Sequence, residues 1–130
     1  EVLEKTKVPC EVIAYGRLPV MLMENCVIKS AYKCTKGEGS FFLEDRKGER
    51  FPLICEQCRN VLLNSVPLYM ADKYEDLLKL KADSLALYFT VETYNETKEV
   101  INAYKKAQRG EIAKNPFNRI TRGHFYRGVE

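Results

Sequence analysis

The sequence predicts an α/β fold, because a helix–strand–helix succession fills its second half and a β-hairpin flanked by cysteines lies in its first half. Thr93 and Glu96 have the spacing of a capping box, and mostly apolar residues at helical intervals follow them. Gly110 suits the position just after that helix. The apolar residues 84–89 before it form a predicted strand. Because alternating helices and strands favour parallel pairing, we expect an earlier strand beside residues 84–89.

The first helix of this succession is predicted to begin at Asp72. Glu75 stands three residues further on, as in a second capping box. Apolar side chains, together with the aliphatic part of a lysine side chain, then repeat at helical spacing. Residues 82–83 end this pattern. The predicted helix therefore runs from Asp72 to the start of the strand at residues 84–89.

Strands and loops are predicted in the first half. Apolar runs at residues 12–14 and 18–23 predict two strands, and the polar stretch 25–40 predicts an irregular loop. Two β-rich runs, 41–44 and 50–54, flank a short turn with Gly48 and predict the hairpin. The remaining predictions are a short strand at 61–63 and an extended C-terminal segment, 111–130, that docks on another part of the protein.

Length and composition limit the class of protein. The chain has 130 residues, 45% hydrophobic and 30% charged, so residues 1–130 are expected to be one globular domain or a piece of one. The net charge of +3 does not by itself indicate nucleic-acid binding. No apolar run approaches the roughly 20 residues that span a bilayer, so we expect no membrane association. A first residue that is Glu rather than Met suggests a fragment of a longer protein.

Four of the five cysteines form a candidate metal site. Cys26 and Cys34 precede the hairpin, and Cys55 and Cys58 follow it as Cys-x-x-Cys, so the hairpin can bring the two pairs together. Four thiolates suit a structural zinc ion or a four-iron iron–sulfur cluster, and the ligands alone do not separate these. The alternative is that they are buried apolar side chains. Cys10 is predicted to be a plain thiol, and the odd count favours a reducing cytoplasm.

The C-terminal segment holds the candidate substrate-binding residues. His124 is the single histidine of the chain, and Arg122 and Arg127 stand near it among aromatic residues. Arginines beside aromatics can hold a phosphate or a stacked base, whereas the alternative is a solvated surface segment. The sequence shows no nucleophile elbow, no phosphate loop and no His-Glu-x-x-His helix, so the catalytic residues are unknown.

Several segments in order resemble the collagenase-like peptidase family (peptidase family U, number 32). They are Tyr15-Gly16-Arg17-Leu18-Pro19-Val20-Met21, Glu24-Asn25-Cys26, Leu43-Glu44-Asp45-Arg46-Lys47-Gly48 with Phe51-Pro52-Leu53, Asn64-Ser65 with Pro67-Leu68, and the run from Thr121 to Val129. The resemblance implies a barrel-like α/β catalytic domain, of which this chain is the carboxy-terminal portion. The partial barrel would then be completed by the remainder of the parent domain, or the fragment would pair as a homodimer.

The resemblance also implies function. The family carries a peptidase, hence hydrolase, label, and some relatives are similar to iron–sulfur proteins that support oxygen-independent hydroxylation of RNA or of a quinone precursor. In those relatives four cysteines hold a four-iron, four-sulfur cluster, and by similarity the ligands here are Cys26, Cys34, Cys55 and Cys58. The chain departs from the family in lacking a Gly/Arg-rich segment that ends in closely spaced cysteines. Three hypotheses follow: a peptidase with a peptide substrate, a cluster-dependent hydroxylation protein with an RNA or small-molecule substrate, and a zinc-stabilised structural or interaction module. The isolated fragment is expected to be inactive.

Overall fold

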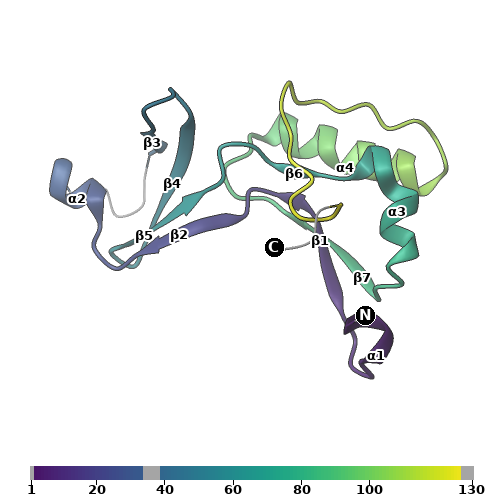
Figure 1. Cartoon of the computed structure of the whole chain (residues 1–130). Coiled ribbons are helices and arrows are strands. Elements are labelled where there is room, and N and C mark those ends of the chain that lie inside the picture. The colour runs from purple at the N-terminus through teal and green to yellow at the C-terminus, as the bar shows by residue number, and fades with distance from the viewer. Residues whose placement is uncertain (1, 34–38, 127–130) are drawn as a thin grey trace. The chain divides into compact units, whose positions relative to one another are not determined.

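The computed structural model describes residues 2–33 and 39–126 (Figure 1), and these residues form a mixture of helices and strands. The predicted α/β class is confirmed. The strands of this part of the chain make two small open sheets and no closed barrel. None of its helices is long and apolar enough to cross a membrane.

The chain divides into two compact units. Unit 1 comprises Glu1–Gly16 and Pro67–Glu130, and unit 2 comprises Arg17–Val66. In the order of the chain, unit 2 lies between the two segments of unit 1. The prediction of one domain, or a piece of one, for residues 1–130 stays a prediction. Each unit has its own sheet and its own apolar core.

Unit 1 is built on a three-stranded sheet in the order β6-β1-β7. β1 (Glu11–Gly16) follows the short helix α1 (Val2–Lys5), and β7 (Ser84–Tyr88) pairs with it in parallel. This confirms the expected pairing of the apolar strand with an earlier one. β6 (Leu68–Tyr69) completes the sheet on the other side of β1, in the antiparallel direction.

The helix after β7 matches its prediction. α4 (Tyr94–Gln108) begins with the capping box: the Thr93 hydroxyl accepts a hydrogen bond from the Glu96 backbone N–H, and the Glu96 carboxylate accepts one from the Thr93 N–H. Gly110 adopts a left-handed φ of 75° after the last turn, as glycine does most easily.

The helix before β7 differs from its prediction. A 3-10 turn, η1 (Ala71–Lys73), leads into α3 (Tyr74–Lys79), whose N-cap is Lys73 and has no side-chain capping bond. The predicted capping box at Asp72 is therefore wrong. The Asp72 carboxylate is held instead by Arg122, a residue of the C-terminal segment.

The core of unit 1 joins the sheet, the helices and the C-terminal segment. Tyr104 of α4 donates its hydroxyl hydrogen to the Ala14 carbonyl at 2.6 Å and accepts from the Met70 N–H at 2.9 Å. The C-terminal segment, yellow in Figure 1, returns past β6, where Thr121 bridges to Leu68. Residues from all these parts share the core, namely Ala14, Tyr15, Leu68, Tyr69, Met70, Ala71, Leu77, Val100, Ala103, Tyr104 and Ala113.

Unit 2 is built on a four-stranded antiparallel sheet in the order β2-β5-β4-β3. Its strands are β2 (Pro19–Met23), β3 (Phe41–Glu44), β4 (Arg50–Glu56) and β5 (Arg59–Leu63). The predicted hairpin is β3–β4, and the Asp45 carboxylate stabilises its turn by accepting hydrogen bonds from the Lys47 and Glu49 N–H groups. β4 and β5 form a second hairpin, which sequence analysis did not predict.

A short helix, α2 (Val27–Ala31), lies in the stretch that was predicted to be an irregular loop, so that part of the prediction is wrong. Five residues are too few for a recognisable helical period. Ile28 of this helix is buried with Leu53 of β4 and Cys26, and these three residues form the core of unit 2. The helix therefore places Cys26 against the sheet.

Candidate metal centre

Cys26 and Cys55 lie together in unit 2, and their Sγ atoms are 3.5 Å apart. Cys26 stands directly before α2, and Cys55 lies near the end of β4. Cys26 is buried and Cys55 is half-buried, and both are thiols rather than a disulfide. The structure thus brings together one cysteine from before the β3–β4 hairpin and one from after it, as the sequence predicts.

Cys26 also caps the helix that it precedes. Its Sγ accepts a hydrogen bond from the Lys29 backbone N–H at 3.4 Å. That bond lowers the pKa of the Cys26 thiol below its ordinary value, with a smaller contribution from Cys55, although burial acts in the opposite direction. The local backbone therefore favours the thiolate, which is the form that binds metals.

Asn60 holds this arrangement in place, and sequence analysis did not single it out. Its side chain is fully buried, its Oδ1 accepts from the Val27 N–H at 2.7 Å, and its Nδ2 donates to the Ile54 carbonyl at 3.4 Å. Asn60 is also the cross-strand partner of Cys55. The amide thus ties the first turn of α2 to the strand that carries Cys55. A polar residue at the start of an apolar strand does not by itself indicate this role in the sequence.

Cys58 occupies the turn of the β4–β5 hairpin. Gln57 and Cys58 have φ values of 50° and 62°, as a two-residue turn of the primed type requires, and Cys58 is exposed. Cys34 lies outside the described residues. Within residues 2–33 and 39–126, no three Cys, His, Asp or Glu side chains come together as a metal site. Cys10 lies in unit 1, where its thiol contacts the Val8 carbonyl.

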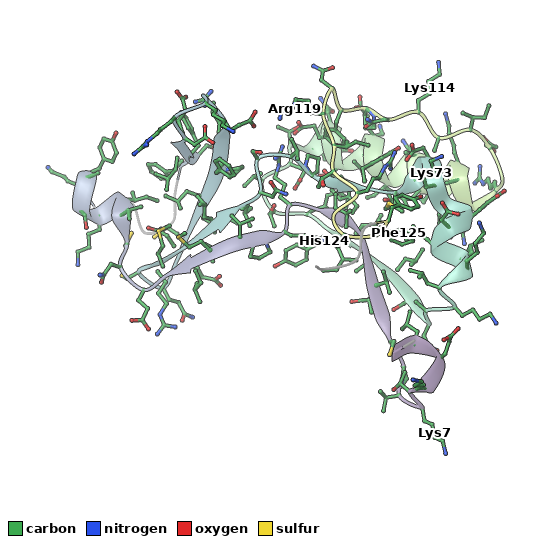
Figure 2. All side chains as sticks on the ribbon, in the orientation of Figure 1. Lys7, Lys73, Lys114, Arg119, His124 and Phe125 are labelled. Atoms are coloured by element: carbon green, nitrogen blue, oxygen red, sulfur yellow. The ribbon has the colours of Figure 1, made fainter. Side chains whose placement is uncertain are left out.

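The predicted substrate-binding residues belong to the C-terminal segment of unit 1. The guanidinium of Arg122 donates to both carboxylate oxygens of Asp72, at 2.6 Å each, and also to the Tyr69 carbonyl. His124 is exposed on this segment (Figure 2), and Arg127 lies outside the described residues. Arg122 therefore ties the C-terminal segment to η1 and β6.

The Asp72–Arg122 pair leads to a prediction about pH. The hydrogen bonds from Arg122 lower the pKa of the Asp72 carboxyl below its ordinary value of 3.8. Because the folded-state pKa is depressed, the stabilisation is complete above about pH 4 and is lost as the pH falls through the folded-state value. We expect Asp72→Asn to reduce the free energy of unfolding by about 1–2 kcal/mol at pH 7, and by less at pH 3.

Urea unfolding at the two pH values measures this difference. The matched control is Glu99→Gln, which neutralises an exposed carboxylate on α4. Equal losses at pH 7 and pH 3 for Asp72→Asn would show that the ion pair is not their source.

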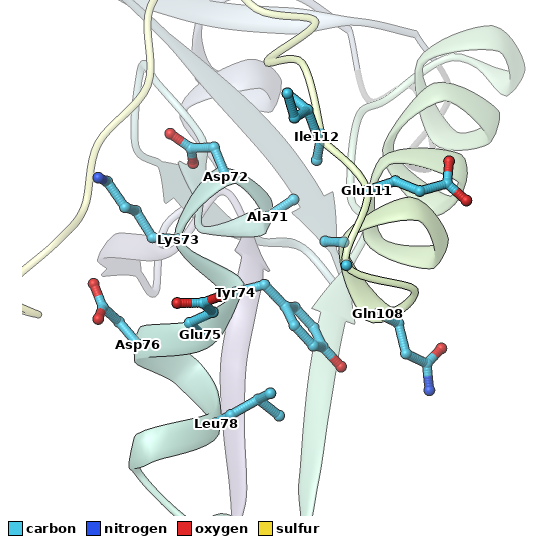
Figure 3. Close-up of a pocket in the computed structure, with 13 residues that line it drawn as sticks. Ala71, Asp72, Lys73, Tyr74, Glu75, Asp76, Leu78, Gln108, Glu111 and Ile112 are labelled. Atoms are coloured by element: carbon cyan, nitrogen blue, oxygen red, sulfur yellow. The ribbon is translucent and has the colours of Figure 1, made fainter.

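A pocket of about 500 Å³ lies in unit 1 between α3 and the end of α4. Figure 3 shows Tyr74 pointing from α3 towards the C-terminal end of α4, where Gln108 lies. Among its carboxylates, Asp72 is held by Arg122, and Asp76 accepts hydrogen bonds from Lys79 and Tyr126. These two carboxylates stabilise the fold, so the cysteine pair of unit 2 is the stronger candidate site.

Comparisons of the chain with family models, with curated proteins and with solved structures found no match. The resemblance to the collagenase-like peptidase family therefore stays a prediction, and the cysteine geometry is the principal observation that bears on function.

Proposed function

We propose that the chain belongs to a collagenase-like peptidase family protein in which Cys26, Cys34, Cys55 and Cys58 supply thiolates to an iron–sulfur cluster. The observation that supports this proposal is that Cys26 and Cys55, which come from separate parts of unit 2, lie side by side. The chemistry of the donors fits, because thiolates are the usual ligands of such clusters. A reducing cytoplasm is the compartment that would keep them as thiols.

The protein's own residues prepare this site. Asn60 holds α2 against the β4–β5 hairpin, and the Lys29 N–H group fixes the direction of the Cys26 sulfur. Cys58 is presented on the hairpin turn, three residues beyond Cys55. When bound, a cluster would supply electron transfer, as oxygen-independent hydroxylation in the longer parent requires. The peptide or RNA substrate would be bound through Arg122, His124 and Arg127, which remain predicted residues.

A zinc-stabilised module is the second candidate, and the sulfur–sulfur distance favours it. Bonds of about 2.3 Å in a tetrahedron place two thiolates on one zinc ion roughly 3.8 Å apart. The observed 3.5 Å is close to that separation. In a four-iron cluster the thiolates bind different irons and lie further apart. A zinc site would stabilise unit 2 without taking part in catalysis.

The first test measures iron, zinc and acid-labile sulfide in anaerobically purified protein, together with its absorbance spectrum. We expect bound metal in the wild type and loss of most of it in Cys26→Ser and Cys55→Ser. The matched control is Cys10→Ser, which removes a thiol from unit 1 and leaves the metal content unchanged.

Each result of this test distinguishes the candidates. Iron with sulfide supports the cluster and directs the search to hydroxylation substrates. Zinc without sulfide supports the structural module. The absence of both metals from the wild type, in the isolated chain and in its longer parent, would contradict both candidates and leave the peptidase hypothesis.

A further inference from the structure

We infer that Cys26 and Cys55 form a site of reversible oxidation, at which a small disulfide such as oxidised glutathione converts the two thiols into an intramolecular disulfide. The inference rests on the geometry of the two sulfurs and does not require that the site binds a metal. It concerns the same residues as the proposed function, so its test is made on metal-free protein.

The geometry requires little movement. The sulfurs are 3.5 Å apart, and a disulfide bond is about 2.05 Å long, so they have to approach by roughly 1.5 Å. Cys26 lies in the link before α2, whereas Cys55 is fixed in β4 between two other strands. Small rotations of the two side chains can therefore close the gap while the sheet stays in place.

The two thiols differ in their access to solvent. Cys26 is 8% exposed, and Cys55 is half-buried. A small disulfide therefore reaches Cys55 before Cys26, and Cys26, already in contact with the Cys55 sulfur, is placed to resolve the adduct. This division of roles follows from burial and contact alone.

The chemistry proceeds by two thiol–disulfide exchanges. The Cys55 thiolate attacks one sulfur of oxidised glutathione, which breaks the glutathione S–S bond, forms a mixed disulfide on Cys55 and releases one glutathione. The Cys26 thiolate then attacks the Cys55 sulfur of that mixed disulfide, forms the Cys26–Cys55 bond and releases the second glutathione. The protein loses two electrons and two protons in total, and oxidised glutathione gains them.

The sequence motif alone would select a different pair. Cys-x-x-Cys motifs often form their own disulfide, which here would join Cys55 to Cys58. Among the residues that the structure describes, Cys26 places its sulfur 3.5 Å from that of Cys55, while Cys58 is exposed in the hairpin turn. The expected product is therefore a bond between the N-cap residue of α2 and strand β4, and not one within the β4–β5 hairpin.

The test treats reduced, chelator-washed protein with oxidised glutathione, alkylates the remaining thiols under denaturing conditions and maps the peptides. We expect alkylation to fall from five thiols to three, and dithiothreitol to restore five. Cleavage after Lys and Arg places Cys26 on peptide 18–29 and places Cys55 with Cys58 on peptide 51–59. A link between these peptides is the expected product.

Three variants assign the bond. Cys58→Ser and Cys10→Ser should both keep the link between peptides 18–29 and 51–59. Cys26→Ser should lose this link, because Cys26 is the cysteine of peptide 18–29. Circular dichroism shows whether each variant is folded. If a variant is not folded, the peptide map of the wild-type protein alone decides the outcome.

A Cys55–Cys58 or Cys34–Cys55 link, or glutathione adducts alone in the wild type, would overturn the inference. Because the protein is metal-free, the link can form whether or not the metal analysis is positive, so the two tests fail independently. Bound metal should delay the link, since the metal occupies the thiolates that the exchange needs.

Discussion

Gly16→Ala is expected to cause the largest loss of stability, roughly 3 kcal/mol in the free energy of unfolding of unit 1. Gly16 has a φ of 142°, a conformation that side chains rarely adopt, and a Cβ atom there would lie 2.4 Å from the Tyr88 carbonyl oxygen. Gly16 pairs with Tyr88 on one side and with Leu68 on the other, so the backbone cannot move away without disrupting the sheet.

Urea unfolding followed by circular dichroism measures this loss. The matched control is Gly48→Ala in the β3–β4 turn, where φ is 79° and no atom lies within 4 Å of the added Cβ. This control carries the conformational penalty without the clash, so we expect a loss of about 1 kcal/mol. Similar losses in both variants would show that the close approach of Gly16 and Tyr88 contributes little.

Tyr104→Phe is expected to have the second largest effect, a loss of about 2–3 kcal/mol. The parallel register of β1 and β7 shifts between Ile13 and Tyr15, so Ala14 has no partner in the ladder. The Tyr104 hydroxyl donates to the carbonyl of this bulged residue and accepts from the Met70 N–H. Phenylalanine keeps the ring in the core but leaves these two buried groups without the hydroxyl.

The measurement is again urea unfolding, with Tyr94→Phe as the control. Tyr94 lies on the same helix with 78% of its surface exposed, so the loss of its hydroxyl should change the free energy of unfolding by less than about 0.5 kcal/mol. Burial raises the pKa of Tyr104 far above its ordinary value. The hydroxyl therefore stays protonated near neutral pH, and the difference between the two variants should be the same at pH 6 and pH 8.

The features that sequence analysis predicted correctly depend on residues close together in the chain. The capping box of Thr93 and Glu96 is complete within four residues. The β3–β4 turn is likewise formed by the Asp45 side chain and the N–H groups that follow it. Such local interactions form with few requirements on the rest of the fold.

The features that were wrong or missed depend on distant residues. Asp72 has the spacing of a helix cap, but Arg122, fifty residues further on, competes for its carboxylate with a bidentate, charge-assisted pair. The two-residue strand β6 is defined by pairing with β1 and by the return of the C-terminal segment at Thr121. Neither arrangement leaves a periodic pattern in the sequence.

At the candidate site, too, one feature was predicted from the sequence and another was missed. The hairpin between the cysteine pairs led to the prediction that the two pairs come together, and the structure places one member of each pair, Cys26 and Cys55, side by side. The buried amide of Asn60 was not predictable, because its partners Val27 and Ile54 belong to other elements and its role exists only once α2 has packed on the sheet.

Because unit 2 is inserted into the chain of unit 1, the conformational entropy of unit 2 affects the stability of unit 1. The chain leaves unit 1 after Gly16 and re-enters it before Leu68, and these two residues are antiparallel partners. Within unit 2, the Asn64 N–H donates to the Leu18 carbonyl at 2.9 Å. A folded unit 2 therefore keeps its own two ends close together. If unit 2 unfolds, those ends are joined by a flexible loop of about 50 residues, whose closure is less favourable than that of a short turn by about 2 kcal/mol. Any change that unfolds unit 2 should therefore also lower the melting temperature of unit 1.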